Sequence, residues 1–146
     1  MKVLIINGPN LNMLGLREPA LYGETTYGEL VRKMRKFCAG RGIKPSFYQS
    51  NCEGAIVGRI QKAKGRFDAI EINAGAYTHT SIAILDALKC AALPCAEVHI
   101  TDIAAREEYR RFSYISEYAF TTVKGEGIDG YFTALDEIAA YLKIHD

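Results

Sequence analysis

Glu97 and His99 stand two residues apart in the segment Ala96–Thr101, a spacing that is compatible with acid catalysis. Side chains alternate along a β-strand, so a strand here would place both on the same face. A carboxylate beside an imidazole raises the pKa of the imidazole and fixes its orientation, as a general acid near neutral pH requires. The same two residues could equally form a satisfied ion pair at a sheet edge. The residues alone leave both interpretations open.

Arg17 and Tyr22 form a second candidate pair, in the Gly- and Pro-rich segment Asn7–Glu24. A free phenol ionises only near pH ~10, so a tyrosine acts as a base at neutral pH only where a cation stabilises its phenolate. The guanidinium of Arg17, five residues away, cannot lose its own charge. A surface arginine beside a tyrosine packed under a loop is the alternative, and the spacing alone favours it.

Asn73 and His79 are candidate ligands for hydroxyl or carboxylate groups. Between them Gly75 permits a tight backbone path, and Thr80 or Ser81 can cap the helix that follows. The mixed basic and acidic run 105–111 favours, taken alone, a solvated helical face with internal ion pairs.

The elements that must position these residues alternate between short apolar runs and longer amphipathic ones, as in a parallel sheet flanked by helices. We expect strands at Lys2–Ile6, Lys44–Gln49, Asp68–Asn73, Ala96–Thr101 and Tyr118–Val123, and helices from Thr26 to about Gly40, at Ala55–Ala63, at Thr80–Ala92 and at Gly130–Leu142. Thr26 and Glu29 match a capping box. The pattern predicts a flavodoxin-like, doubly wound α/β fold: a five-stranded parallel sheet with helices on both faces. Ligands of such sheets bind at the carboxyl ends of the strands, which directs attention to Asn7–Gly23, Asn73–Ser81 and His99–Arg110.

The 146 residues suit one catalytic domain, 1–146, in which residues 8–24 form a loop that covers the site. A net charge of +1 gives no case for nucleic acid or an anionic membrane surface, and no stretch approaches the ~18 apolar residues of a membrane span. The four cysteines form no CxxC pair, which favours reduced thiols in the cytoplasm over a disulfide scaffold or a metal site. Gly8 and Gly15 do not have the spacing of a P-loop.

Eleven short motifs are distributed along the chain between Lys2 and about Leu142. They are Ile6–Asn12, Leu14–Pro19, Tyr22–Gly23, Gln49–Asn51, Ile72–Asn73, Gly75–Ala76, Thr78–Ser81, Glu97–Ile100, Ala105–Glu108, Ser113–Ser116 and Gly127–Tyr131. In this order and spacing they closely resemble the type II 3-dehydroquinate dehydratase family. The resemblance implies a hydro-lyase that converts 3-dehydroquinate to 3-dehydroshikimate by trans elimination through an enolate, in aromatic amino acid biosynthesis (the shikimate pathway) or in quinate catabolism. It implies no metal, no cofactor and no Schiff-base lysine.

The resemblance also implies a role for each site residue. Tyr22 would remove the proton beside the ring ketone, and Arg17 would favour its phenolate and help to close the lid. Asn10 would stabilise the enolate through an ordered water, and His99, supported by Glu97, would protonate the departing hydroxyl. The substrate-binding residues would be Asn73 and the backbone near Ile100 and Thr101 for the carboxylate, His79 and Arg110 for ring hydroxyls, Arg106 at the entrance, and Asp86 from a neighbouring subunit of a dodecamer built from four trimers.

Several positions depart from the family pattern. Thr101 and Asp102 stand where Ser-Asn is common, and we expect Asp102 to bring negative charge near the substrate carboxylate and weaken affinity. Ala104, Tyr48 and Cys52 replace a frequent His, Arg and His, but none is assigned a proton transfer. Two other functions are compatible with the fold: a flavin- or nucleotide-binding module, and an oligomeric relative that binds the ligand without turnover.

Overall fold

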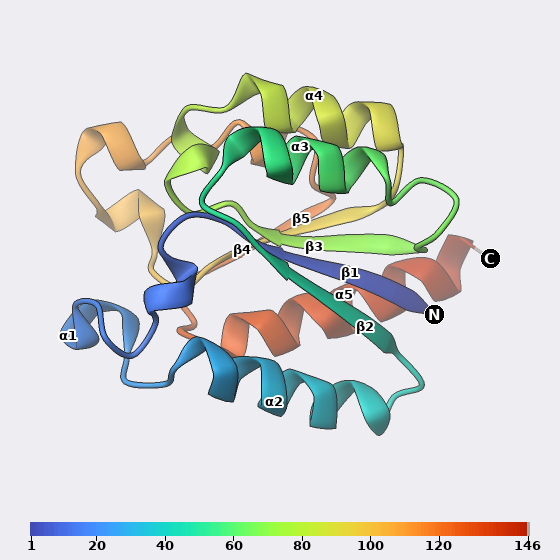
Figure 1. The fold of residues 1–146 in the computed structure, drawn as a ribbon, viewed down its shortest axis with the longest axis horizontal. Helices are drawn as coiled ribbons and strands as arrows, with labels where there is room; N and C mark the ends of the chain where they lie inside the picture. Colours follow the sequence, from blue (N-terminus) through green and yellow to red (C-terminus); the bar gives the residue numbers. More distant parts are fainter. Residues whose placement is uncertain (146) are drawn as a thin grey trace.

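A computed structural model describes residues 1–145 and contains one sheet of five parallel strands in the order β2-β1-β3-β4-β5 (Figure 1). The strands are β1 (Lys2–Asn7), β2 (Lys44–Gln49), β3 (Ala69–Asn73), β4 (Cys95–His99) and β5 (Thr121–Lys124). This is the strand order of the flavodoxin-like fold, in which the chain turns back at the junction of β1 and β3. The predicted fold class is confirmed.

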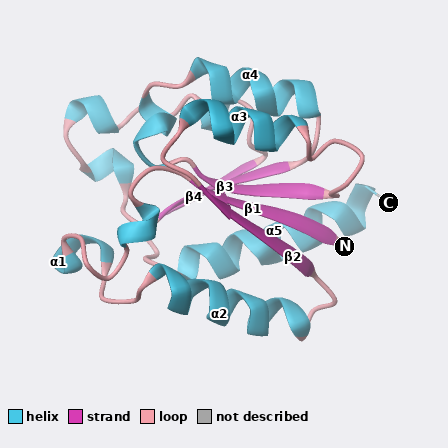
Figure 2. Ribbon diagram, viewed as in Figure 1, coloured by secondary structure: helices cyan, strands magenta, loops and turns pink. Residues whose placement is uncertain are grey.

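Helices cover both faces of the sheet, with α2 (Tyr27–Ala39) and α5 (Asp129–His145) on one side and α3 (Glu53–Gln61) and α4 (Ile82–Ala91) on the other (Figure 2). The two faces of β1 are therefore both buried, and Val3–Ile6 are fully inaccessible. Val3 and Ile5 pack towards α2 and α5, whereas Leu4 and Ile6 pack towards α3 and α4. A strand buried on both faces explains why the sequence there is continuously apolar rather than alternating.

Element boundaries follow local capping. The Thr26–Glu29 capping box is present, and α2 begins directly after Thr26. Ser81, not Thr80, caps α4 by accepting a hydrogen bond from the Ile84 amide at 2.9 Å. Some boundaries differ from the predicted ranges. Helix α3 starts two residues earlier than predicted, and β5 starts three residues later. Strand β4 ends at His99, and α5 extends to His145.

The segment 8–24 is not a simple loop, because it contains a short 3₁₀ turn at Leu11–Met13 and a four-residue helix α1 at Pro19–Tyr22. Pro19 occupies the first helical position, where its fixed φ suits a helix and its missing N–H costs nothing. The sequence prediction missed this helix, whose last residue is Tyr22. No helix within residues 1–145 is long and apolar enough to cross a membrane.

The parallel register brings Asn7 and Asn73 side by side at the carboxyl ends of β1 and β3. The chain then passes closely over itself: the Gly8 amide donates to the Asn73 carbonyl at 2.8 Å, and a side chain at Gly8 would collide with the Ala74 carbonyl. The neighbouring residues Pro9, Asn73 and Gly75 line the candidate site.

Candidate active site

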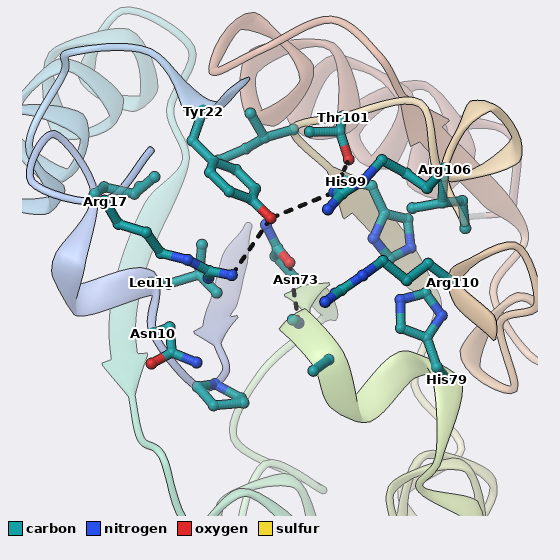
Figure 3. A pocket seen from close by; sticks show the side chains of 16 residues that line it. Asn10, Leu11, Arg17, Tyr22, Asn73, His79, His99, Thr101, Arg106 and Arg110 are labelled. Carbon is teal, nitrogen blue, oxygen red and sulfur yellow. Dashed lines mark hydrogen bonds between the residues drawn. The ribbon is translucent and has the colours of Figure 1, made fainter. Parts of the chain in front are cut away.

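A cavity of about 190 Å³ opens at the carboxyl ends of β1, β3 and β4, beneath the segment 8–24 (Figure 3). Its lining residues are Pro9, Asn10, Leu11, Leu14, Arg17, Tyr22, Asn73, Gly75, Ala76, His79, His99, Ile100, Thr101, Ile103, Arg106 and Arg110. Pockets for drug-sized ligands measure roughly 300–1,000 Å³, so this one suits a single small molecule. It lies where doubly wound sheets bind their ligands.

Two guanidinium groups converge on the hydroxyl of Tyr22. Arg17 Nη2 donates to the Tyr22 oxygen at 3.5 Å, and Arg106 Nη1 donates to the same oxygen at 3.3 Å. Arg106 is held in place by a second hydrogen bond, to Thr101 Oγ1 at 3.2 Å. Two cationic side chains therefore lie within hydrogen-bond distance of one phenol oxygen. The interpretation of Arg17 as an unconnected surface residue is wrong, and the contact from Arg106 was not foreseen.

Glu97 and His99 form a buried pair, with His99 Nε2 lying 2.6 Å from Glu97 Oε1. The carboxylate also accepts hydrogen bonds from Thr78 and Ser113, both at 2.5 Å, and from Thr122 at 3.1 Å. Burial alone would raise the pKa of Glu97. The hydrogen bond and charge of His99, together with the hydrogen bonds from Ser113 and Thr78, outweigh that effect, so the pKa of Glu97 lies below its ordinary value. Glu97 is therefore a carboxylate at neutral pH.

This satisfied pair does not lie at a sheet edge. Glu97 is fully buried, and β4 lies between β3 and β5. Only His99 of the two lines the cavity, with Glu97 behind it. The arrangement can hold a proton on the imidazole and present it to a ligand.

Asn73 has a fixed amide orientation at the cavity floor. Its Oδ1 accepts from the Gly75 amide at 3.1 Å, and its Nδ2 donates to the Tyr131 hydroxyl at 2.8 Å. Tyr131 was given no role by the sequence, although it stands in the Gly127–Tyr131 motif. That motif was the one available signal for it.

His79 and Arg110 line the wall of the cavity that lies opposite Arg17 (Figure 3). His79 Nδ1 lies 2.7 Å from the Phe112 carbonyl oxygen. Burial lowers the pKa of His79, and the charge of Arg110 contributes to this lowering, so the imidazole is neutral at neutral pH. A neutral imidazole and a guanidinium are suitable partners for hydroxyl groups.

The run 105–111 is not a single solvated helix but belongs to two 3₁₀ turns, Ile103–Ala105 and Glu108–Arg110. The predicted internal ion pairs are present, because Glu107 lies 3.5 Å from Arg106 and 3.3 Å from Arg110. Both arginines nevertheless line the cavity, so the run is more than a solvated face.

The predicted residue Asp86 and, apart from Thr101, the positions that depart from the family pattern lie outside the cavity lining. Asp86 is exposed on α4, and Ala104, Tyr48 and Cys52 are not part of the lining. The Asp102 carboxylate accepts a hydrogen bond from the Ala104 amide at 3.0 Å and lies 4.0 Å from Lys124 Nζ. Asp102 is absent from the cavity lining, and its carboxylate is engaged by the Ala104 amide and lies near Lys124, so the effect of its charge on a ligand stays a prediction.

Comparisons with known proteins find relatives over nearly the whole chain. The family model for class II dehydroquinases matches residues 1–139. A catabolic 3-dehydroquinase of Verticillium alfalfae is 48% identical over 145 residues, which cover 99% of this chain and 97% of the relative. A 3-dehydroquinate dehydratase of Geotalea daltonii is 47% identical over 143 residues, covering 98% and 99%. The crystal structure of a type II dehydroquinase from Butyrivibrio crossotus superposes with a TM-score of 0.93 at 44% identity, covering 95% of this chain and 97% of that one.

Proposed function

The chain belongs to the class II dehydroquinase family, and from that premise we propose that it dehydrates 3-dehydroquinate to 3-dehydroshikimate by trans elimination through an enolate. Such an elimination needs a base, an acid and a stabiliser for the charged oxygen. The observation that carries the proposal is that a phenol flanked by cations and a carboxylate-backed imidazole line one small cavity.

Tyr22 is the proposed base. Its phenolate removes the proton from the carbon beside the ring ketone, and the guanidinium groups of Arg17 and Arg106 stabilise that phenolate. Both arginines keep their charge throughout the reaction, because a guanidinium does not lose its proton in proteins. The contact of Arg106 with the phenol supports a role beyond lining the entrance.

His99 is the proposed acid. Its Nε2 is engaged by Glu97, so Nδ1 is the nitrogen left to protonate the departing hydroxyl. Ionised Glu97 stabilises the imidazolium before it gives up its proton. Tyr22 comes from α1 above the cavity and His99 from the end of β4, so the base and the acid approach a ligand from different walls (Figure 3). That placement supports a trans elimination.

The remaining lining residues suit a carboxylated polyol ring. Asn10, held in a left-handed conformation with φ 68°, is the proposed stabiliser of the enolate through a water molecule. Asn73 and the backbone of Ile100 and Thr101 are proposed to bind the carboxylate, while His79 and Arg110 bind the ring hydroxyls.

We also propose a homo-oligomeric assembly of trimers grouped into a dodecamer in the cytoplasm. Asp86, exposed on α4, would complete the site of a neighbouring subunit. The relatives include catabolic enzymes and a 3-dehydroquinate dehydratase, so the role is quinate catabolism or aromatic amino acid biosynthesis. Light scattering measures the size of the assembly directly.

The decisive experiment follows the conjugated enone product by its ultraviolet absorbance. We expect the purified chain to produce it from 3-dehydroquinate, and Tyr22→Phe to abolish turnover without changing the thermal unfolding temperature. Tyr118→Phe is the matched control, because its hydroxyl donates to the Leu93 carbonyl at 2.9 Å, outside the cavity lining. Normal turnover by Tyr22→Phe would exclude the proposed base.

A further inference from the structure

Tyr131 joins two asparagines at the floor of the cavity through one hydroxyl group. The side chain stands in the first turn of α5 and is fully buried. Its hydroxyl donates to Asn7 Oδ1 at 2.6 Å and accepts from Asn73 Nδ2 at 2.8 Å. Asn7 and Asn73 are register partners at the ends of β1 and β3. A residue near the carboxyl end of the chain thus links the two central strands where the site is built.

The direction of these hydrogen bonds decides how Asn73 is oriented. The Tyr131 hydroxyl uses its one hydrogen as the donor to Asn7, so towards Asn73 the Tyr131 oxygen can act only as a hydrogen-bond acceptor. A flipped Asn73 would place its own oxygen against that acceptor and its NH₂ group against the Gly75 N–H. Both contacts would become repulsive, and each group would be left unsatisfied in a buried place.

The fixed orientation leaves Asn73 with one uncommitted donor. Its Oδ1 is used by Gly75 and one N–H of Nδ2 by Tyr131, which leaves the second N–H. Asn73 lines the cavity, whereas Asn7 and Tyr131 do not. Only the Asn73 amide therefore carries the effect of this arrangement to a ligand.

We propose that Tyr131 is a positioning residue for substrate binding: its hydroxyl holds the Asn73 amide so that an N–H, and not an oxygen, is available to the substrate carboxylate. The proposal rests on the proposed function, because it assigns the carboxylate to Asn73. Burial raises the pKa of Tyr131 far above that of a free phenol, so the hydroxyl stays neutral and takes no part in proton transfer.

The test compares Tyr131→Phe with Tyr118→Phe, each of which removes one hydroxyl and keeps the ring. Because Tyr131 acts through a carboxylate contact and not through the base or the acid, we expect its loss to raise KM about tenfold or more and to change kcat by less than about threefold. Tyr118→Phe should leave both constants unchanged. A fall in kcat at constant KM would overturn the proposal.

A second ligand separates positioning from general damage to the fold. Calorimetry measures the affinity for a carboxylated ring ligand and for its analogue with a hydroxymethyl group in place of the carboxylate. We expect Tyr131→Phe to weaken binding of the first ligand about tenfold and of the second hardly at all. An equal loss for both ligands would show a merely structural role.

Two further variants keep the test decisive. Asn7→Ala removes the acceptor that fixes the Tyr131 proton, and it should reproduce the selective loss even if Tyr131→Phe folds poorly. In an Asn73→Ala background, Tyr131→Phe should have no additional effect on affinity, whereas additive losses would contradict the coupling. These binding measurements need no turnover. A protein that binds selectively but fails to dehydrate 3-dehydroquinate would reject the proposed function and retain this inference.

Discussion

Arg106 Nη1 donates to the hydroxyl of Tyr22 at 3.3 Å, although 84 residues separate the two in the sequence. Arg17, only five residues from Tyr22, makes the longer contact at 3.5 Å. The phenol therefore lies between a cation from its own segment and a cation from the turn after β4. Because Tyr22 stands on the segment 8–24, this contact links that segment to the turn after β4.

Removing either cation should slow catalysis. We expect Arg106→Gln and Arg17→Gln each to lower kcat about tenfold or more, because the phenolate loses one of its two stabilising charges. Arg106→Lys should recover part of the loss, since it keeps the charge but not the planar geometry. Steady-state rates from the enone absorbance measure this. Arg35→Gln is the control, because Arg35 is exposed on α2 and outside the cavity lining. An unchanged kcat in Arg106→Gln would contradict the assigned contact.

Thr78→Val should make the enzyme more sensitive to acid. The Thr78 hydroxyl is one of the donors that lower the pKa of Glu97, so its loss lets that pKa rise. Glu97 is ionised above its pKa, and activity that depends on the carboxylate is lost as the pH falls through that value. The acidic limb of the kcat profile should therefore move to higher pH.

The same substitution should reduce stability at neutral pH by about 1.5–3 kcal/mol, the usual contribution of a hydrogen bond to a charged group. Chemical denaturation measures this value. Thr133→Val is the matched control, because its hydroxyl donates to exposed Glu126 at 2.7 Å. A kcat profile that superposes on that of the wild type would count against the role given to Thr78.

Glu71→Leu should stabilise the protein at neutral pH. Glu71 is fully buried in β3, and neither of its oxygens has a hydrogen-bond partner within residues 1–145. Burial raises its pKa well above the ordinary value, so the folded state keeps a proton that the unfolded state releases above pH ~4.3. Stability then falls as pH rises from that value towards the folded pKa.

Removing this carboxyl should raise the free energy of unfolding at pH 8 by about 1–3 kcal/mol and flatten its pH dependence. Denaturation at several pH values gives both quantities. The comparison is Glu137→Leu on the exposed face of α5, which should change little. A destabilised Glu71→Leu would mean that the buried carboxyl has a partner in solution.

Asp102→Asn should leave KM within about twofold of the wild type, because the carboxylate caps the Ala104 amide and lies near Lys124 outside the cavity lining. Asparagine can make the same cap. Substrate titrations check this. A KM about tenfold lower in the variant would instead show that the substrate carboxylate feels this charge.

The sequence alone determined the local structure and the chemistry that depends on it. Buried strands, the Thr26–Glu29 capping box and the shared face of Glu97 and His99 follow from interactions between residues a few positions apart. Alternating strands and helices then specified a flavodoxin-like sheet, and with it the edge where the site lies.

Only the tertiary structure decided which distant groups meet. The contact of Arg106 with Tyr22 and that of Tyr131 with Asn7, 124 residues away, depend on strand register and on the packing of distant segments, which no local pattern encodes. Local preferences fix the elements because their energies involve neighbours in sequence, whereas the final orientation of a side chain depends on packing and hydrogen bonding across the whole fold.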